Sequence, residues 1–187
     1  MPRKPDARTR IASADELTRL LAEAKPGLRC LILLCLSTAM RLSEAMSICQ
    51  ANYDATNKTV TFKGKGGVTN QLPVTEEIAA LFASAAPATA NESFVLALSE
   101  NANATSTMQS QWDALKKKVG VDPRLRIHDL RRTQAAAVYR STKDLRLVQQ
   151  LLGHRRMEST FLYLAPHDPH NLKPLIEAIQ PTTKVLQ

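Results

Sequence analysis

The chain has 187 residues, of which 44% are hydrophobic and 22% charged, and its formal net charge is +8. This length suits one domain with a substantial core, and the composition is that of a soluble globular protein rather than a disordered or fibrous one. The longest apolar run, over residues 30–36, is too short to span a bilayer, and the basic N-terminus lacks the apolar stretch of a secretory signal, so we expect a cytoplasmic protein without a membrane span.

The three cysteines, Cys30, Cys35 and Cys49, are odd in number and are not arranged in the close pairs that bind metals. Unpaired cysteine is among the residues most often found in protein cores. We therefore expect all three to serve in packing, with no disulfide framework and no metal site.

Helical patterns dominate the first part of the chain. Residues 1–10 hold two prolines and four basic residues without periodicity, which indicates a linker or tail. Ser13 followed by Glu16 forms a capping-box pattern that opens a helix reaching about Ala24. A more buried helix over about 28–37 and a short helix over about 42–48 are predicted to follow.

Two alternating segments, residues 58–63 and 70–74, flank a glycine-rich stretch and predict a β-hairpin. Thr75 can cap a helix from Glu76 to about Ala85. The run over residues 94–96 is predicted to add a short strand, since it combines aromatic and branched side chains.

The second half of the chain is predicted to be helical. A helix over 105–119 ends near Gly120, and the next, over 128–140, places Leu130, Ala137 and Val138 on one face. The remaining predicted helices, all of them short, cover residues 145–152, 160–164 and 171–179. The expected fold class is mainly α with a small antiparallel β-sheet.

Basic charge is concentrated between Lys116 and Arg156, where twelve Lys or Arg stand against three Asp. Such a concentration is the electrostatic footprint of a polyanion partner, because each neutralised phosphate releases condensed counterions. A solvated basic surface without a partner is the alternative, and charge alone does not decide between them.

A set of chemically capable side chains occurs near this stretch. His128 and Arg131 are three residues apart and would face the same side of a helix. His154 follows the glycine expected to end a helix, and Tyr163 comes nine residues later. Taken singly, each has an ordinary explanation, and Tyr163 among apolar neighbours could simply be a core tyrosine.

The candidate residues belong to five short motifs that follow one another in a fixed order. They are residues 38–44 with Arg41, residues 64–66 and 72–74 around Lys65, residues 128–132, residues 151–154 and residues 160–163. In order and spacing they resemble the signature of the tyrosine recombinases, the DNA strand-exchange enzymes of the phage-integrase type. The resemblance covers roughly residues 11–180, and it departs from the family pattern at Ala39, where glycine is usual.

The resemblance implies the catalytic-domain fold of this family and a site-specific recombinase that acts in DNA integration or excision. By this resemblance the enzyme would cleave one DNA strand through a 3′-phosphotyrosyl link to Tyr163, and the 5′-hydroxyl of the incoming strand would reverse the reaction. The resemblance also implies that neither a metal nor a nucleotide cofactor is needed, because the phosphotyrosine would retain the bond energy. The expected partners are double-stranded DNA and further copies of the chain, which would form a tetramer on DNA, with the monomer as the alternative state when free.

The roles of the six candidate residues also make chemical sense. Arg41 and Arg131 would neutralise the nonbridging oxygens of the reacting phosphate, since guanidinium groups match two such oxygens and stay charged. His128 is the first candidate to accept the tyrosine proton, and His154 could donate a further hydrogen bond. Lys65 rather than Lys63 is expected to protonate the leaving 5′-oxygen.

Neighbouring residues are expected to play supporting parts. Glu44 would orient Arg41, Arg132 would contact the DNA backbone or an acidic partner, and Trp112 would pack in the core. The expected organisation is a basic tail over residues 1–10, the catalytic domain with its C-terminal helix over 11–180, and a tail over 181–187. The DNA-clamping domain that precedes this pattern in the family is expected to be absent from the chain.

Two other functions are compatible with parts of the pattern. A type IB topoisomerase-like nuclease uses similar chemistry, but the glycine before His154 and the interval from His128 favour a recombinase. A DNA-binding module that has lost catalysis is the other alternative, and the presence of all six candidate residues argues against it.

Overall fold

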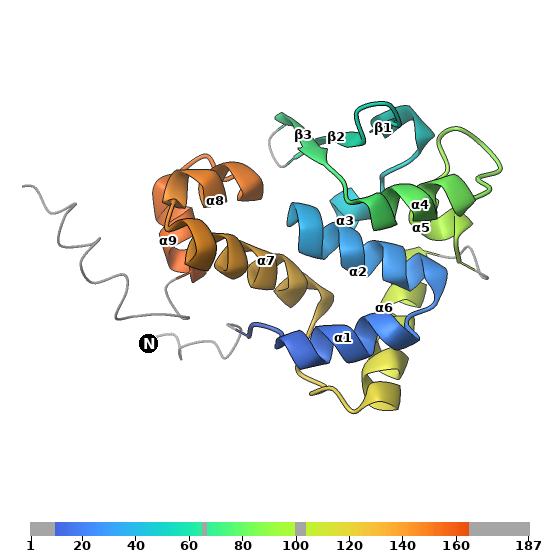
Figure 1. The fold of residues 1–187 in the computed structure, drawn as a ribbon, viewed down its shortest axis with the longest axis horizontal. Helices are drawn as coiled ribbons and strands as arrows, with labels where there is room; N and C mark the ends of the chain where they lie inside the picture. The colour runs from blue at the N-terminus through green and yellow to red at the C-terminus, as the bar shows by residue number, and fades with distance from the viewer. Residues whose placement is uncertain (1–9, 65–66, 100–103, 165–187) are drawn as a thin grey trace, which may run out of the picture.

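The computed structural model describes residues 10–64, 67–99 and 104–164. Helices account for most of these residues, and a small sheet lies at one edge of the molecule (Figure 1). The helices are α1 (Ala14–Glu23), α2 (Pro26–Thr38), α3 (Leu42–Ala45), α4 (Glu76–Ser84), α5 (Phe94–Ala97), α6 (Ala104–Val119), α7 (Ile127–Thr142), α8 (Leu145–Leu152) and α9 (Met157–Leu164), with a 3₁₀ turn η1 (Gln50–Asn52). The mainly α fold class is thereby confirmed.

The sheet consists of the short strand β1 (Tyr53–Asp54) and the predicted hairpin, β2 (Thr59–Lys63) and β3 (Thr69–Pro73). Its order is β1-β2-β3, and both pairings are antiparallel. Val60 is opposite Leu72 on one side and Tyr53 on the other. The sequence pattern did not predict β1, because two residues are too few to show alternation.

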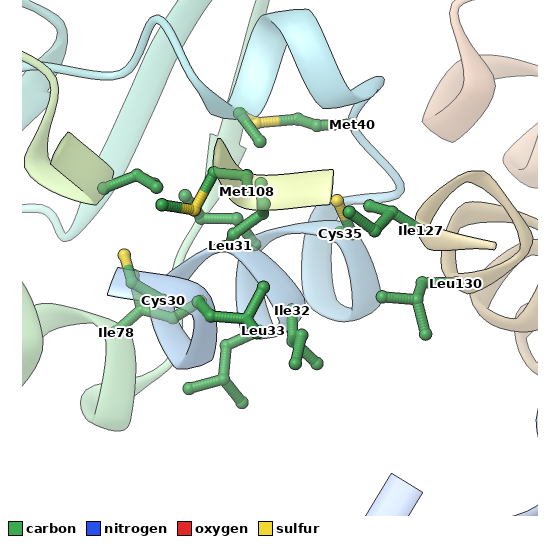
Figure 2. Packing of buried hydrophobic residues seen from close by; sticks show 14 of the residues in the cluster. Cys30, Leu31, Ile32, Leu33, Cys35, Met40, Ile78, Met108, Ile127 and Leu130 are labelled. Carbon is green, nitrogen blue, oxygen red and sulfur yellow. The ribbon is translucent and has the colours of Figure 1, made fainter. Parts of the chain in front are cut away.

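Helix α2 lies at the centre of the fold and contacts α3, α4, α5, α6 and α7. It is buried on most sides, which explains its nearly continuous apolar sequence. Figure 2 shows Leu31, Cys35 and their neighbours packed against Met108 of α6 and Leu130 of α7. All three cysteines are free and buried, as expected, and Trp112 is fully buried with its indole N–H donating to the Leu125 carbonyl at 3.0 Å.

A second, smaller cluster lies beyond this core. It joins the later part of α7 to α8 and α9 through the buried side chains of Ala39, Ala135, Ala136, Tyr139, Leu145, Val148, Leu152 and Leu164. Helix α7 therefore passes from the large cluster, where Leu130 packs, into the small one.

Local signals fixed several helix ends as predicted. The Ser13 hydroxyl accepts from the Glu16 backbone N–H, and the Glu16 carboxylate accepts from the Ser13 backbone N–H, which completes the capping box. Thr75 caps α4. Gly153 ends α8 in the left-handed conformation with φ 58°.

Three predictions about the elements were wrong. Residues 94–96 form the helix α5 rather than a strand: Phe94 and Val95 are buried beside α2, and their burial overrides β-propensity. Helix α3 ends at Ala45 rather than near residue 48. On α7 the small cluster uses Ala135, Ala136 and Tyr139, whereas Ala137 is exposed and Val138 only partly buried.

The predicted helix over residues 171–179 lies outside the described residues. None of the described helices is long and apolar enough to cross a membrane.

Candidate active site

Arg41 stands immediately before α3, where the chain has turned away from the end of α2. The turn is made by Ala39, whose φ of 52° and ψ of 29° place it in the left-handed region. The Glu44 carboxylate then holds Arg41 twice, accepting from its backbone N–H at 2.7 Å and from its Nη1 at 2.7 Å. These two hydrogen bonds support the prediction that Glu44 orients Arg41.

Arg131 is buried where three elements meet. Its Nη1 donates to the Ala39 carbonyl at the end of α2, and its Nη2 donates to the Leu152 carbonyl at the end of α8 at 2.6 Å. The Glu44 carboxylate lies 3.8 Å away. Since the side chain of Arg131 is only 4% exposed and that of Arg41 is 29% exposed, Arg131 is the more rigidly held of the two cations.

A small depression lies in front of the two arginines. It is lined by residues from α3, the hairpin and the end of α8, namely Arg41, Glu44, Phe62, Gly64, Val68, Asn70, Arg131, Leu151, Leu152 and Gly153. The hairpin therefore reaches the arginine pair at Gly64, directly before Lys65. Lys65 lies outside the described residues, and Lys63 is exposed at the end of β2.

Tyr163 projects from α9 toward α7 and the end of α8. The edges of two imidazole rings approach it, His154 with ring centroids 5.7 Å apart and His128 with centroids 6.4 Å apart. The guanidinium carbon of Arg132 lies over the ring, 4.7 Å from its centroid. The hydroxyl is buried, and within the described residues it makes no hydrogen bond of ordinary geometry.

Burial dominates the electrostatics of these groups. It raises the pKa of the Tyr163 phenol above its ordinary value, and the charges of Arg131 and Arg132 oppose this effect. Burial also lowers the pKa of His154 to about 4, with Arg131 and Arg41 acting in the same direction. The pKa of His128, the more exposed of the two histidines, is lowered by burial and by the nearby arginines. Both imidazoles are therefore neutral near pH 7.

His154 is placed by contacts around the α8–α9 turn. Its backbone N–H donates to the Gln149 carbonyl at 3.1 Å, and the Gln149 side-chain amide donates to the His154 carbonyl at 2.9 Å. Its Nδ1 lies 3.1 Å from the hydroxyl of Thr160, which is buried in α9. When this hydroxyl donates to Nδ1, the proton of the neutral ring resides on Nε2, which is then a hydrogen-bond donor.

The structure brings five of the six predicted residues into one region. The five are Arg41, His128, Arg131, His154 and Tyr163, and the sixth, Lys65, is outside the described residues. Two contacts were not predicted from the sequence: Thr160 with His154, and Arg132 with the Tyr163 ring. Arg132 follows His128 by four residues, so helical spacing was a signal for the second contact.

The basic stretch is less uniformly exposed than its composition suggests. Lys116 is buried, with its amine donating to the Pro123 carbonyl at 2.6 Å and paired with Asp113 at 2.9 Å. Lys118 pairs with Glu23, and Arg124 pairs with Asp122. The exposed cations of α7 to α9 remain, namely Arg126, Arg140, Lys143, Arg146, Arg155 and Arg156. The described residues contain no cluster of three or more ligand side chains suited to a metal ion.

Comparisons with known proteins agree with this geometry. Residues 10–170 match the family model described as "Phage integrase family". Tyrosine recombinase XerC of Xanthomonas campestris pv. campestris is 30% identical over 191 aligned positions, which cover 98% of this chain and 59% of that relative. The chain thus spans less than two thirds of this relative's length.

Solved structures show the same fold. The crystal structure of XerA recombinase superimposes with a TM-score of 0.71 at 23% identity, covering 97% of this chain and 67% of that one. For the catalytic domain of bacteriophage HP1 integrase the TM-score is 0.63 at 21% identity, covering 95% and 98%. XerH site-specific recombinase bound to palindromic difH substrate gives 0.66 at 20% identity, covering 89% and 52%. Over residues 10–170, then, the chain belongs to the phage integrase family of tyrosine recombinases.

Proposed function

We propose that this chain is the catalytic domain of a site-specific DNA recombinase that cleaves and rejoins strands through a 3′-phosphotyrosyl intermediate. The observation that carries the proposal is the position of the Tyr163 ring, with two neutral imidazoles at its edges and two arginines close by. A core tyrosine would not need so many polar neighbours.

The proposed reaction gives each of the six candidate residues a role. The Tyr163 oxygen attacks the DNA phosphorus while His128, neutral near pH 7, takes the phenolic proton. Arg41 and Arg131 neutralise the charge that grows on the nonbridging oxygens, and the Nε2–H of His154 donates to one of them. The bond to the 5′-oxygen breaks, and Lys65 supplies the proton that this oxygen needs.

Preorganisation explains why two arginines differ so much in exposure. Arg131 is fixed by the Ala39 and Leu152 carbonyls, so its charge costs no rearrangement when the phosphate arrives. Arg41 is held by Glu44 from one side and stays partly exposed, which leaves donors available for a phosphate. Arginine suits both places because it remains charged when it is buried.

The proposed substrate is double-stranded DNA, and the active assembly is a tetramer of copies on DNA. The exposed cations of α7 to α9 would contact backbone phosphates near the site. That XerH was solved with its difH substrate supports this choice of substrate. We place the catalytic domain at residues 11–180, with residues 1–10 and 181–187 as tails.

The deciding experiment is covalent trapping on nicked DNA labelled in the segment on the 5′ side of the cleaved bond, because the 3′-phosphate of that segment becomes joined to Tyr163. Tyr163→Phe should abolish the protein–DNA adduct and leave DNA affinity nearly unchanged, because it removes one hydroxyl and no cation. A module without catalysis would give no adduct even with the unmodified chain. An adduct that survives in Tyr163→Phe, formed for example by Tyr139, would disprove the assignment of the nucleophile.

A further inference from the structure

Arg132 contributes a contact to Tyr163 that the proposed reaction does not use. Helix α7 presents His128 and Arg132, one turn apart, toward α9, and both touch the Tyr163 ring. His128 and His154 approach the ring at its edge, at interplanar angles of 89° and 83°. Arg132 is therefore the charged group over the face of the ring, at 4.7 Å from its centroid.

This placement matters because of the charge that Tyr163 must develop. When a phenol loses its proton, the negative charge spreads from the oxygen into the ring. A guanidinium over the ring face already attracts the neutral ring, and it attracts the phenolate more strongly. Burial of the hydroxyl opposes ionisation, so a nearby cation that offsets this cost makes the oxygen a better nucleophile.

The contacts of Arg132 differ from those of Arg131, the other arginine of α7 in the site. Arg131 uses its Nη atoms on the carbonyls of Ala39 and Leu152 and lies beside the proposed phosphate position. Arg132 is partly buried against the nucleophile itself.

We propose that Arg132 is a positioning residue for the nucleophile: it holds the Tyr163 ring by its face and stabilises the phenolate that forms during attack. This inference rests on the proposed role of Tyr163. It replaces the expectation that Arg132 contacts the DNA backbone or an acidic partner.

The groups that face Tyr163 set the direction of the expected effect. They are His128, Asp129, Arg131 and Arg132 on α7, and His154 at the α8–α9 turn. Burial of the phenol raises its pKa, and so does the nearby charge of Asp129. The charges of Arg131 and Arg132 lower it. Removing the charge of Arg132 takes away one of the effects that lower the pKa of Tyr163. Burial should then raise this pKa further.

The first test measures this ionisation directly, without DNA. Ultraviolet difference titration of each protein against its Tyr163→Phe counterpart isolates Tyr163 from the other two tyrosines, Tyr53 and Tyr139. Arg132→Met, which keeps an unbranched side chain but not the charge, should move the titration to higher pH. Arg132→Lys should stay near the unmodified protein.

A matched control lies on the same helix. Arg140 is exposed, and its side chain is bonded to the Ala136 carbonyl of its own helix. Arg140→Met removes the same charge two turns further along and should leave the Tyr163 titration unchanged. Circular dichroism verifies that each variant folds, and Arg132→Gln replaces Arg132→Met if the latter does not.

The second test measures adduct formation on nicked DNA at a fixed pH below the phenol titration. Arg132→Met should slow the reaction about tenfold, as expected for the loss of a desolvated cation–π contact, and Arg132→Lys should recover most of the rate. Raising the pH should restore part of the rate of Arg132→Met, since more of its phenol ionises.

The outcomes separate this inference from the proposed function. If the unmodified chain forms no adduct, the proposed function fails, and the DNA-free titration still decides the role of Arg132. If Arg132→Met titrates like the unmodified protein, the inference is overturned. The same holds if its sole effect is weaker DNA binding with a salt slope smaller by about 1, which is the signature of one lost phosphate contact.

Discussion

The two hydrophobic clusters carry different parts of the candidate site. The large cluster around α2 supports α3 with Arg41 and Glu44 and the hairpin that leads to Lys65. The small cluster of α7, α8 and α9 supports His154 and Tyr163. Arg41 and the hairpin that leads to the proposed general acid thus belong to one region, whereas the nucleophile and His154, the proposed donor to a nonbridging oxygen, belong to the other.

Arg131 is the residue that joins the two regions. It lies on α7, the helix that enters both clusters, and its guanidinium binds the carbonyl ends of α2 and α8. A shift of either region by an ångström would break one of these bonds. The site therefore depends on the relative position of these two packing units, and one buried cation fixes this position.

The largest predicted effect follows from the loss of Lys65, the proposed general acid. Lys65→Ala should slow cleavage of ordinary DNA by about a hundred to ten thousandfold, the usual range for this form of catalysis, and Lys63→Ala should slow it only modestly. Lys63 is exposed on β2, whereas Gly64, which precedes Lys65 in the sequence, lines the depression beside the arginines.

A sulfur substitution tests the mechanism behind this prediction. A 5′-bridging sulfur leaves without a proton, so it should restore cleavage by Lys65→Ala. Arg131→Ala should gain far less, because its proposed charge acts on nonbridging oxygens. Rescue of Lys63→Ala in place of Lys65→Ala would move the general acid to Lys63.

The next effect is a difference in the free energy of unfolding between variants of Arg131 and Arg41. Arg131→Met leaves the Ala39 and Leu152 carbonyls without their donor, and it should lower the free energy of unfolding by about 2–4 kcal/mol. Arg41→Met should cost about 1 kcal/mol, since Arg41 is partly exposed and Glu44 keeps the Arg41 backbone N–H.

Urea unfolding and adduct formation should be measured together for these two variants. Both should lose about a hundredfold or more in adduct rate, because each removes a donor to the phosphate. Equal losses of stability would mean that Arg131 does not hold the two regions together.

A smaller effect is the pH dependence contributed by His154. Burial lowers its pKa to about 4 in the folded chain, while an unfolded histidine titrates near its ordinary value of 6.5. The unfolded state therefore binds more protons between these values, and stability is present above pH 6.5 and is lost as the pH falls toward 4. The loss should be roughly 1–2 kcal/mol, since solvent partly screens the ring.

His154→Gln checks this contribution. Urea unfolding at pH 7 and at pH 5 should show a smaller loss of stability on acidification in the variant than in the unmodified chain. His128 remains in both proteins and contributes in the same direction, so the variant should keep part of the slope. Identical slopes would show that His154 is not buried as neutral imidazole.

Local chemistry made much of this molecule predictable from its sequence. The Ser13 capping box, the Gly153 helix end and the hairpin each depend on a few neighbouring residues, and all three formed as expected. The five candidate residues that the structure describes were chosen because their spacing in the chain resembles that of a known family, and the structure places them in one region.

What the sequence did not reveal depends on surroundings that no local pattern encodes. Residues 94–96 became helical because they pack beside α2. Lys116 counted as part of the basic footprint until the structure placed its amine against the Pro123 carbonyl. The contact of Arg132 with Tyr163 likewise requires α9 to lie against α7, which is a property of the tertiary fold.

The smallest predicted effect lies at Ala39, where the two regions meet and where the family usually has glycine. The left-handed conformation costs a residue with a β-carbon about 1–2 kcal/mol, and Ala39 adopts it with φ 52°. Ala39→Gly removes this strain, but it also removes a fully buried methyl group, worth about 0.8 kcal/mol, and makes the unfolded chain freer by about 0.4–1 kcal/mol. These contributions nearly cancel, so the free energy of unfolding should change by less than about 0.5 kcal/mol.

Ala135→Gly is the matched comparison, because Ala135 is equally buried in the small cluster but has ordinary helical geometry in α7. There the same deletion relieves no strain, and it should cost about 1–2 kcal/mol through the lost methyl group and the poor helix propensity of glycine. The difference between the two variants in urea unfolding therefore measures the strain at Ala39. Since the Ala39 carbonyl accepts from Arg131, Ala39→Gly should also leave adduct formation intact. If Ala39→Gly instead destabilised the chain as much as Ala135→Gly, the turn that aims Arg41 would be unstrained, and alanine would serve there as well as glycine.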